Sequence, residues 1–408
     1  MAITYPMPSY SFIAEKAMWS CRYLAILTVI AAPISTAIAS VASMAMLLFW
    51  LMSGEVGPTL RRSVQQPVGK VLVLFIVWLM ISSLYAEGSW AEKFNALSSW
   101  KKLLYTLVLL GLFYQPQWKA RLIHGYVAVM SIMGVLATFM WVLEIPYRKQ
   151  PFGVVMTNHT AQSLAFVVAI LCCILLIKQT LSLQKRGLLS ALIVLLAFNI
   201  LFVSSSRSGY LALPVATVFL SAKLFGHRKI PQLLAMTAVV MVVAALTSTT
   251  LQQRIKVGVE EYKNAQNSQT VTPIGIRDIF RENTLELIKE SPVLGYGTSS
   301  FRNVYSRHVA AKYTDWRGEV AADPHNQYLA IWVENGIIGL LLFLTYIYTA
   351  LRQGLHEQPY GVLAASVLVM ISVTSLFNSH FKTFQEGYLL AFFVGCLMSR
   401  QSAGQAGA

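Results

Sequence analysis

The chain has 408 residues, of which 56% are hydrophobic and only 12% are charged. Soluble domains carry about 25% charged residues, so the composition excludes an ordinary soluble protein and predicts an all-α, polytopic integral membrane protein. The formal net charge is +15. Because most lysines and arginines lie between apolar stretches, we interpret this charge as setting membrane topology and expect no nucleic-acid partner. The four cysteines lie in apolar stretches, which argues against a disulfide framework.

The apolar segments predict about twelve transmembrane helices, because each crossing needs roughly 20 apolar residues. Residues 18–53 are too long for one span, and Pro33 predicts that they divide into a helical hairpin. We expect this first block to act as a signal anchor and not to be cleaved. The other predicted spans are 69–86, 101–115, 121–144, 161–178, 187–204, 208–225, 232–250, 327–351, 360–378 and 384–399.

The short loops predict the orientation of these spans. Basic residues are more frequent in every second connection, which predicts that those connections and both termini are cytoplasmic. The predicted cytoplasmic segments hold Lys16, Arg61, Arg62, Lys119, Arg121, Lys178, Lys185, Arg186, Lys223, Arg228, Lys229, Arg352 and Arg400. The outward segments hold fewer: Lys93, Arg148, Lys149, Arg207 and Lys382, with Lys101 and Lys102 at the start of a span.

One long polar segment interrupts the spans and is predicted to lie outside. It covers residues 251–326, between spans one to nine (1–250) and spans ten to twelve (327–400), and residues 401–408 form a predicted flexible cytoplasmic tail. Loops of this length usually carry function or form a small domain. Two helices are expected in it. One continues out of span nine to residue 265, and an amphipathic one follows Pro273 and ends at Ser291–Pro292, before a Gly-Tyr-Gly turn.

Two arginines of the amphipathic helix, Arg277 and Arg281, lie four residues apart and therefore on one side. We place Arg277 in the first turn, where free backbone N–H groups and the helix dipole favour an anion, and its guanidinium suits a phosphate. Arg281 has an equally plausible simpler interpretation. It lies near Asp278 and several glutamates, so a solvated ion-paired face accounts for it as well as a ligand does.

A third arginine, Arg207, lies in the tight outward turn Ser204-Ser205-Ser206-Arg207-Ser208-Gly209-Tyr210 between two spans. A short hairpin needs no arginine, and this one opposes the topology bias. Together with the serines, including Ser206, and with Tyr210, it predicts a pocket for a lipid-linked phosphate. The alternative is an arginine that extends to the lipid headgroups.

A histidine stands where the polar segment enters the next span. Asp323 and Pro324 form a polar turn, His325 and Asn326 follow, and a long apolar helix begins directly after them. A histidine at a membrane boundary can titrate near neutral pH and act as a general base. The alternative is an interfacial histidine that caps the helix.

Several other residues are secondary candidates. His159 and His380 lie at outward span ends and are expected to line the same cavity. Glu334 lies nine residues after His325, roughly 13 Å along the helix, where an ionisable group is a functional candidate, although pairing with a neighbouring span is the plainer account. The loop residues Arg302, Arg307, His308 and Lys312 are either contacts for charged phosphates or solvated surface.

The SSSRSGY turn, the PVLGYGTSSF turn and the His325-Asn326…Gly336-Ile337-Ile338-Gly339 element occur in this order, with one large outward loop before the last. In its C-terminal half the chain therefore resembles the O-antigen ligase and polymerase superfamily. The resemblance implies a C-type, metal-independent glycosyltransferase that moves O-antigen polysaccharide from undecaprenyl pyrophosphate to a sugar hydroxyl of lipid A–core. It also implies the periplasmic face of a bacterial inner membrane. Arg207, Arg277 and His325 fall on the family's functional positions.

The residues themselves also favour catalysis without a metal or other cofactor. The only aspartates are Asp278, Asp315 and Asp323, and no Asp-x-Asp or Glu-x-Asp pair is present to hold a divalent ion. Fixed arginines must then stabilise the leaving group, and a neutral histidine must accept the proton of the acceptor hydroxyl. Attack from the opposite face would invert the anomeric centre.

Three alternatives remain open. A polymerase that joins glycan repeats, or a protein O-oligosaccharyltransferase that glycosylates pilin, would use the same donor. A lipid-linked glycan transporter or flippase would have a similar number of spans. A transporter is expected to show paired repeats and broken, charged helices near the midplane, which the sequence does not show.

Overall fold

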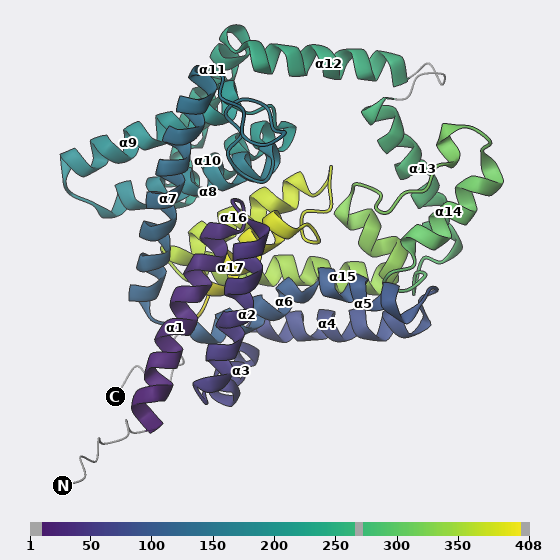
Figure 1. Ribbon diagram of the computed structural model, residues 1–408, viewed down its shortest axis with the longest axis horizontal. Helices are drawn as coiled ribbons and strands as arrows, with labels where there is room; N and C mark the ends of the chain where they lie inside the picture. The colour runs from purple at the N-terminus through teal and green to yellow at the C-terminus, as the bar shows by residue number, and fades with distance from the viewer. Residues whose placement is uncertain (1–9, 266–271, 401–408) are drawn as a thin grey trace.

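The computed structural model describes residues 10–265 and 272–400, which are all-helical and contain no strand within these ranges (Figure 1). The helices before the polar segment are α1 (Tyr10–Ala31), α2 (Thr36–Met52), α3 (Val56–Gln65), α4 (Pro67–Tyr85), α5 (Trp90–Ser99), α6 (Lys101–Leu112), α7 (Pro116–Val142), α8 (His159–Gln179), α9 (Leu183–Phe198), α10 (Arg207–Phe225) and α11 (Ile230–Thr247). The later helices are α12 (Thr249–Ala265), α13 (Pro273–Glu290), α14 (Phe301–Lys312), α15 (Gln327–His356), α16 (Tyr360–Thr374) and α17 (Phe384–Leu397).

The polytopic all-α class is confirmed, but the number of spans is lower than predicted. Within the described ranges seven helices are long and apolar enough to cross a membrane, or up to eight if α2 and α3, bent by 107°, form one span. Each of the twelve predicted segments is helical. However, α6, α16 and α17 have only 12, 15 and 14 residues. At a rise of 1.5 Å per residue they reach roughly 18–23 Å, less than the roughly 30 Å of a bilayer's hydrocarbon layer.

The short apolar helices form the centre of the bundle. α16 and α17 pack against each other and are buried along nearly their whole length, α6 packs against α17, and α10 packs against α16. α8 is also almost entirely buried beside α9 and α10. A helix buried on all sides is as apolar as one that faces lipid. Composition alone therefore could not separate these core helices from full membrane spans.

The turn that carries Arg207 follows an irregular stretch. α9 passes into a π-helical turn at Asn199–Val203, where the Asn199 Nδ2 donates to the Thr138 Oγ1 at 2.8 Å and to the Gly134 carbonyl at 3.2 Å. π-turns are rare and often lie next to functional sites, because they re-aim the residues that follow. Here the π-turn leads directly into Ser204 and the serine-rich turn.

The polar segment differs from the prediction in two places. α12 does not continue α11, because the chain breaks at Ser248, whose hydroxyl donates to the Leu201 carbonyl at 2.7 Å and accepts from the Leu251 N–H at 3.1 Å. α12 then runs across the top of the view in Figure 1. α13 begins at Pro273, so Arg277 lies in the second turn and not in the first. The prediction that Arg277 lies beside the free backbone N–H groups of the first turn is therefore wrong. Residues 266–271 lie outside the described part of the segment.

The two glycine motifs of the C-terminal half form one unit. α15 is kinked at Gly336, where φ is 64° and ψ is −173°. The turn after α13 docks on this kink. The Gly297 N–H donates to the Glu334 carbonyl at 2.7 Å, and the Ile337 N–H donates to the Pro292 carbonyl at 2.9 Å. A Cβ on Gly336 would lie 1.9 Å from the Val293 carbonyl oxygen, so only glycine fits.

Candidate active site

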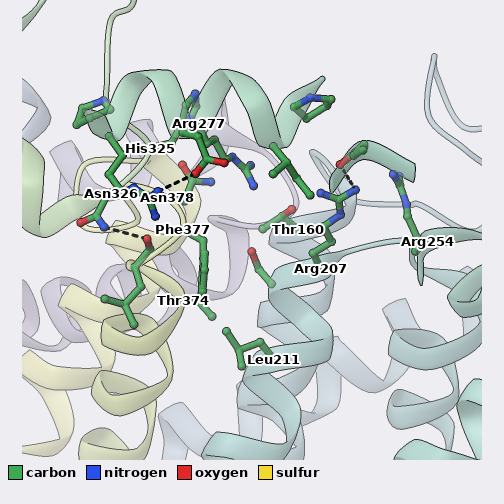
Figure 2. Close-up of a pocket in the computed structure, with 18 of the residues that line it drawn as sticks. Thr160, Arg207, Leu211, Arg254, Arg277, His325, Asn326, Thr374, Phe377 and Asn378 are labelled. Atoms are coloured by element: carbon green, nitrogen blue, oxygen red, sulfur yellow. Dashed lines mark hydrogen bonds and ion pairs between the residues drawn. The ribbon is translucent and has the colours of Figure 1, made fainter. Parts of the chain in front are cut away.

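A cavity of about 780 Å³ lies where four helices begin, and the three principal predicted residues all line it. Figure 2 shows Arg277 on α13 over the cavity, with Arg207 and Arg254 to one side and His325 to the other. Its wall includes the first residues of α8, α10 and α13 and the turn before α15. Helix N-termini favour anions. The full lining is His159, Thr160, Ser205, Arg207, Ser208, Leu211, Arg254, Glu261, Pro273, Ile274, Arg277, Asp278, Arg281, Pro324, His325, Asn326, Leu329, Thr374, Leu376, Phe377 and Asn378.

α12 contributes two charged residues that sequence analysis missed. The Arg207 Nη2 forms an ion pair of 2.7 Å with the Glu261 Oε2. The Arg254 Nη2 donates to the Ser205 Oγ at 3.0 Å. Both residues lie in the charged helix α12, among several other charged and polar side chains. Nothing local in the sequence distinguishes them from its solvated side chains.

Four arginines line the cavity, and among the described residues Arg277 makes no hydrogen bond or ion pair, whereas the other three do. Burial lowers the pKa of its guanidinium, and nearby Arg207 lowers the pKa further, while Glu261 raises it. An arginine on a cavity wall close to a second arginine favours a bound anion, since an anion would relieve the repulsion between them. Arg281, in contrast, pairs with Asp278 at 3.1 Å, as its simpler interpretation predicts, although both residues line the cavity.

His325 is held in an unusual backbone conformation, with φ at 53°. Its backbone N–H donates to the Asp323 Oδ1 at 2.8 Å, and the same oxygen accepts from the Ser379 hydroxyl at 2.6 Å. The imidazole stacks on the Phe280 ring at a centroid distance of 5.9 Å. Its Nδ1 is buried and has no hydrogen-bond partner among the described residues. Strained backbone at a cavity wall is typical of functional sites.

Three of the supporting residues shape the backbone. Asn326 caps α15: its Oδ1 accepts from the Tyr328 N–H at 3.0 Å, and it also lines the cavity. Ser206 caps α10 by accepting from the Gly209 N–H at 3.1 Å, and the Tyr210 hydroxyl donates to the Ser204 carbonyl at 2.7 Å. Neither Ser206 nor Tyr210 is part of the lining.

Of the remaining secondary candidates, one lines the cavity and two do not. His159 lines the cavity at the start of α8, whereas His380 is 1% exposed and lies outside the lining, so its predicted place there is wrong. Burial lowers the pKa of His380, and nearby Glu386 opposes this. Glu334 is also outside the lining. Its Oε2 lies 2.9 Å from the Lys382 Nζ and its Oε1 accepts from the Ser299 N–H at 3.3 Å. Glu334 is thus paired as predicted, although Lys382 belongs to the connection between α16 and α17 and not to a span. Glu334 thus helps to hold the docked turn against α15.

The loop cations lie away from the cavity. Lys312 and His308 both contact Glu286, at 2.7 and 2.9 Å, and Arg307 pairs with Glu87. These contacts fit the surface interpretation. Across residues 10–265 and 272–400, no group of three or more histidine, cysteine, aspartate and glutamate side chains is placed to hold a metal ion.

The fold and the cavity define a class: a multi-pass helical membrane protein with an arginine-rich, histidine-containing cavity where helix N-termini meet. Residues 192–344, which include Arg207, Arg277 and His325, match the family model described as O-antigen ligase. The predicted family resemblance is confirmed over this stretch.

Three similar proteins match stretches of different length. A putative polysaccharide ligase of Rickettsia conorii is 24% identical over 325 residues, which is 74% of each chain. The O-antigen ligase of Salmonella typhimurium is 39% identical over 67 residues, 16% of each chain. An uncharacterised protein of Haemophilus influenzae is 28% identical over 176 residues, and the match spans 43% of that relative and 40% of this chain.

Proposed function

We propose that the protein is a glycosyltransferase of the O-antigen ligase type. It would transfer O-antigen polysaccharide from undecaprenyl pyrophosphate to a sugar hydroxyl of the lipid A–core oligosaccharide. The observation that carries the proposal is the convergence of Arg207, Arg277 and His325 on one cavity from three separate elements. The names of the Rickettsia and Salmonella relatives support the ligase branch.

In this proposal the pyrophosphate of the donor lies between Arg277 and Arg207. Arg277 offers a guanidinium without a carboxylate partner among the described residues, and Arg207 exchanges its Glu261 contact for a phosphate oxygen. The N-termini of α8, α10 and α13 add partial positive charge at the same wall. Fixed cations stabilise the negative charge that develops on the leaving group, so the residues of this chain can supply that stabilisation themselves.

His325 is the proposed general base. Its neutral imidazole accepts the proton of the acceptor hydroxyl while that oxygen forms a bond to the anomeric carbon. The bond from that carbon to the pyrophosphate oxygen breaks, and undecaprenyl pyrophosphate leaves with the electron pair. Attack and departure occur on opposite faces, so the configuration inverts. Asp323 and Ser379 fix the backbone on which the imidazole is carried.

The proposed location is the bacterial inner membrane, with both termini in the cytoplasm and the cavity open to the periplasm. The distribution of basic residues over the short loops supports this orientation. Lipid-linked donor and lipid A–core would then both reach the cavity from the surrounding bilayer.

Complementation tests the proposal. In a Gram-negative host that lacks its own ligase, this protein should restore polymer-capped lipopolysaccharide, and the His325→Ala variant should not. If the protein restores no capping but lengthens single repeats in a polymerase-deficient host, the polymerase alternative replaces the ligase. If it glycosylates pilin instead, the protein O-oligosaccharyltransferase alternative holds.

A further inference from the structure

We propose that the protein has a second ligand site, which binds the phosphate of an anionic phospholipid at the opposite, predicted cytoplasmic end of the bundle. A second cavity, of about 510 Å³, lies between α1, the α2–α3 turn, α3 and the connection from α6 to α7, and it shares no residue with the first. Its lining is Ala14, Glu15, Met18, Trp19, Arg22, Ser53, Glu55, Arg62, Tyr114, Gln115, Gln117 and Trp118.

The central feature of this cavity is Arg22, which is only 6% exposed yet belongs to the lining. Its Nε donates to the Leu112 carbonyl at 3.2 Å, and no carboxylate pairs with it among the described residues. Burying a guanidinium without an anion is costly, and a partner that carries negative charge reduces this cost. The structure thus leaves one buried positive charge at a cavity wall without a counter-ion from the described chain.

A second arginine stands beside the first. The Arg62 Nε donates to the Gly111 carbonyl at 3.0 Å, and its Nη2 lies 3.3 Å from the Glu55 Oε2. Tyr114 lies within reach of both guanidinium groups, whose carbons are 5.7 Å (Arg22) and 5.1 Å (Arg62) from its ring centroid. Aromatic faces stabilise guanidinium groups and hold them in place. The pair therefore presents two preorganised guanidinium groups, whose planar sets of N–H donors suit phosphate oxygens.

The two carboxylates of the lining leave Arg22 without an ionic partner. Glu55 contacts Arg62, and Glu15 is exposed on α1 and forms no ion pair within the described residues. The arginines and glutamates of the lining are equal in number, but neither carboxylate is paired with the buried guanidinium of Arg22. The single negative charge of a phosphate diester can provide this partner.

The surroundings favour a lipid over a soluble phosphate as the source. α3 bends by 107° from α2, so it crosses the end of that helix as an interfacial helix does. On α1, the side chains of Trp19, Tyr23 and Leu27 are 44%, 49% and 44% exposed and recur every four residues. This stripe begins at the cavity and runs along the helix. It offers an apolar path for an acyl chain whose headgroup occupies the cavity, with aromatic residues at headgroup level.

The test is lipid binding by the full-length protein, measured by native mass spectrometry in detergent during titration with phosphatidylglycerol or phosphatidylcholine. Wild type should retain phosphatidylglycerol at concentrations at which it does not retain phosphatidylcholine. Arg22→Gln should weaken phosphatidylglycerol retention roughly tenfold or more, because a charged hydrogen-bonded contact is lost. Arg22→Lys should rescue it only partly. The matched control is Arg61→Gln, since Arg61 is an exposed neighbour on α3 that does not line the cavity.

Equal retention of the two lipids by wild type, or equal losses in Arg22→Gln and Arg61→Gln, would overturn the proposal. A parallel titration with inorganic phosphate separates the two sources of the ligand. If phosphate alone displaces phosphatidylglycerol at millimolar concentration, the site takes soluble phosphate and the lipid assignment is wrong. Thermal unfolding in detergent without added lipid shows whether the Arg22→Gln variant is folded. If that variant is unfolded, phosphatidylglycerol retention by Arg22→Lys is compared with wild type instead.

Discussion

Arg207 and Glu261 form an ion pair of 2.7 Å between the start of α10 and the charged helix α12, 54 residues further along the chain. The pair closes one side of the arginine-rich cavity and places a carboxylate next to a residue proposed to bind the donor pyrophosphate. A phosphate that contacts Arg207 must therefore compete with Glu261. Donor affinity then depends on a residue from α12 as well as on the arginines.

We expect Glu261→Gln to bind the lipid-linked donor several-fold more tightly, because the glutamine keeps the shape of the side chain and removes the competing charge. The measurement is the donor Kd of the purified protein. Glu260→Gln is the matched control, since Glu260 is exposed and outside the lining. Weaker binding by Glu261→Gln would show instead that Glu261 holds Arg207 in its binding position.

The proposed base and the proposed phosphate ligands should give different kinetic defects. His325→Ala should lower turnover about a hundred- to ten-thousand-fold, the usual range for general-base catalysis, while donor affinity changes little. Arg207→Ala and Arg277→Ala should weaken donor binding as well as turnover, and lysine should rescue either only partly. Donor binding and initial rates are measured for all variants in one detergent. Normal saturated turnover with poor donor binding in His325→Ala would make the histidine a binding group.

The kink in α15 should be sensitive to a single methyl group. Gly336→Ala places a Cβ 1.9 Å from the Val293 carbonyl oxygen at a φ of 64°, so we expect a loss of more than about 2 kcal/mol and a clearly lower unfolding midpoint. Gly187→Ala in α9 is the control, because a Cβ there meets nothing within 4 Å. Thermal unfolding compares the two. Equal midpoints would mean that the docked turn adapts to the added atom.

The proposed orientation is tested with introduced thiols, since all four native cysteines are buried. A cysteine in place of the exposed Thr314, in the polar segment, should react with a membrane-impermeant reagent added from the periplasmic side. A cysteine in place of Gly187, at the predicted cytoplasmic end of the span 187–204, should react only after the membrane is opened. The reverse pattern would place the cavity on the cytoplasmic side.

The absence of paired acidic ligands in the sequence predicts activity without a divalent ion. Purified protein with lipid-linked donor should keep its rate in excess EDTA, since arginines stabilise the leaving group in the proposed mechanism. The initial rate is measured before and after chelation. Loss of activity that magnesium or manganese restores would contradict the proposed role of the arginines.

Much of the fold followed from local patterns. Apolar stretches located the helices of all twelve predicted segments, Pro33 located the turn of the first hairpin, and polar composition separated the segment 251–326 from the spans. The short helices α3, α5 and α14 were not predicted. The motifs also led to Arg207, Arg277 and His325, which line one cavity. Fewer helices than the twelve predicted spans are long and apolar enough to cross a membrane on their own. For α6, α16 and α17 the reason is that a short helix enclosed by other helices needs the same apolar composition as one enclosed by lipid.

The sequence by itself therefore determined the membrane class, the helical segments and the residue types available for chemistry, since hydrophobicity, capping and glycine requirements act over a few neighbouring residues. Only the tertiary structure decided which of those residues meet. It brought Glu261 and Arg254 to the cavity, excluded His380 and docked the Pro292–Gly297 turn on Gly336. These contacts join segments tens of residues apart. They depend on how whole helices pack, and no local pattern encodes that packing.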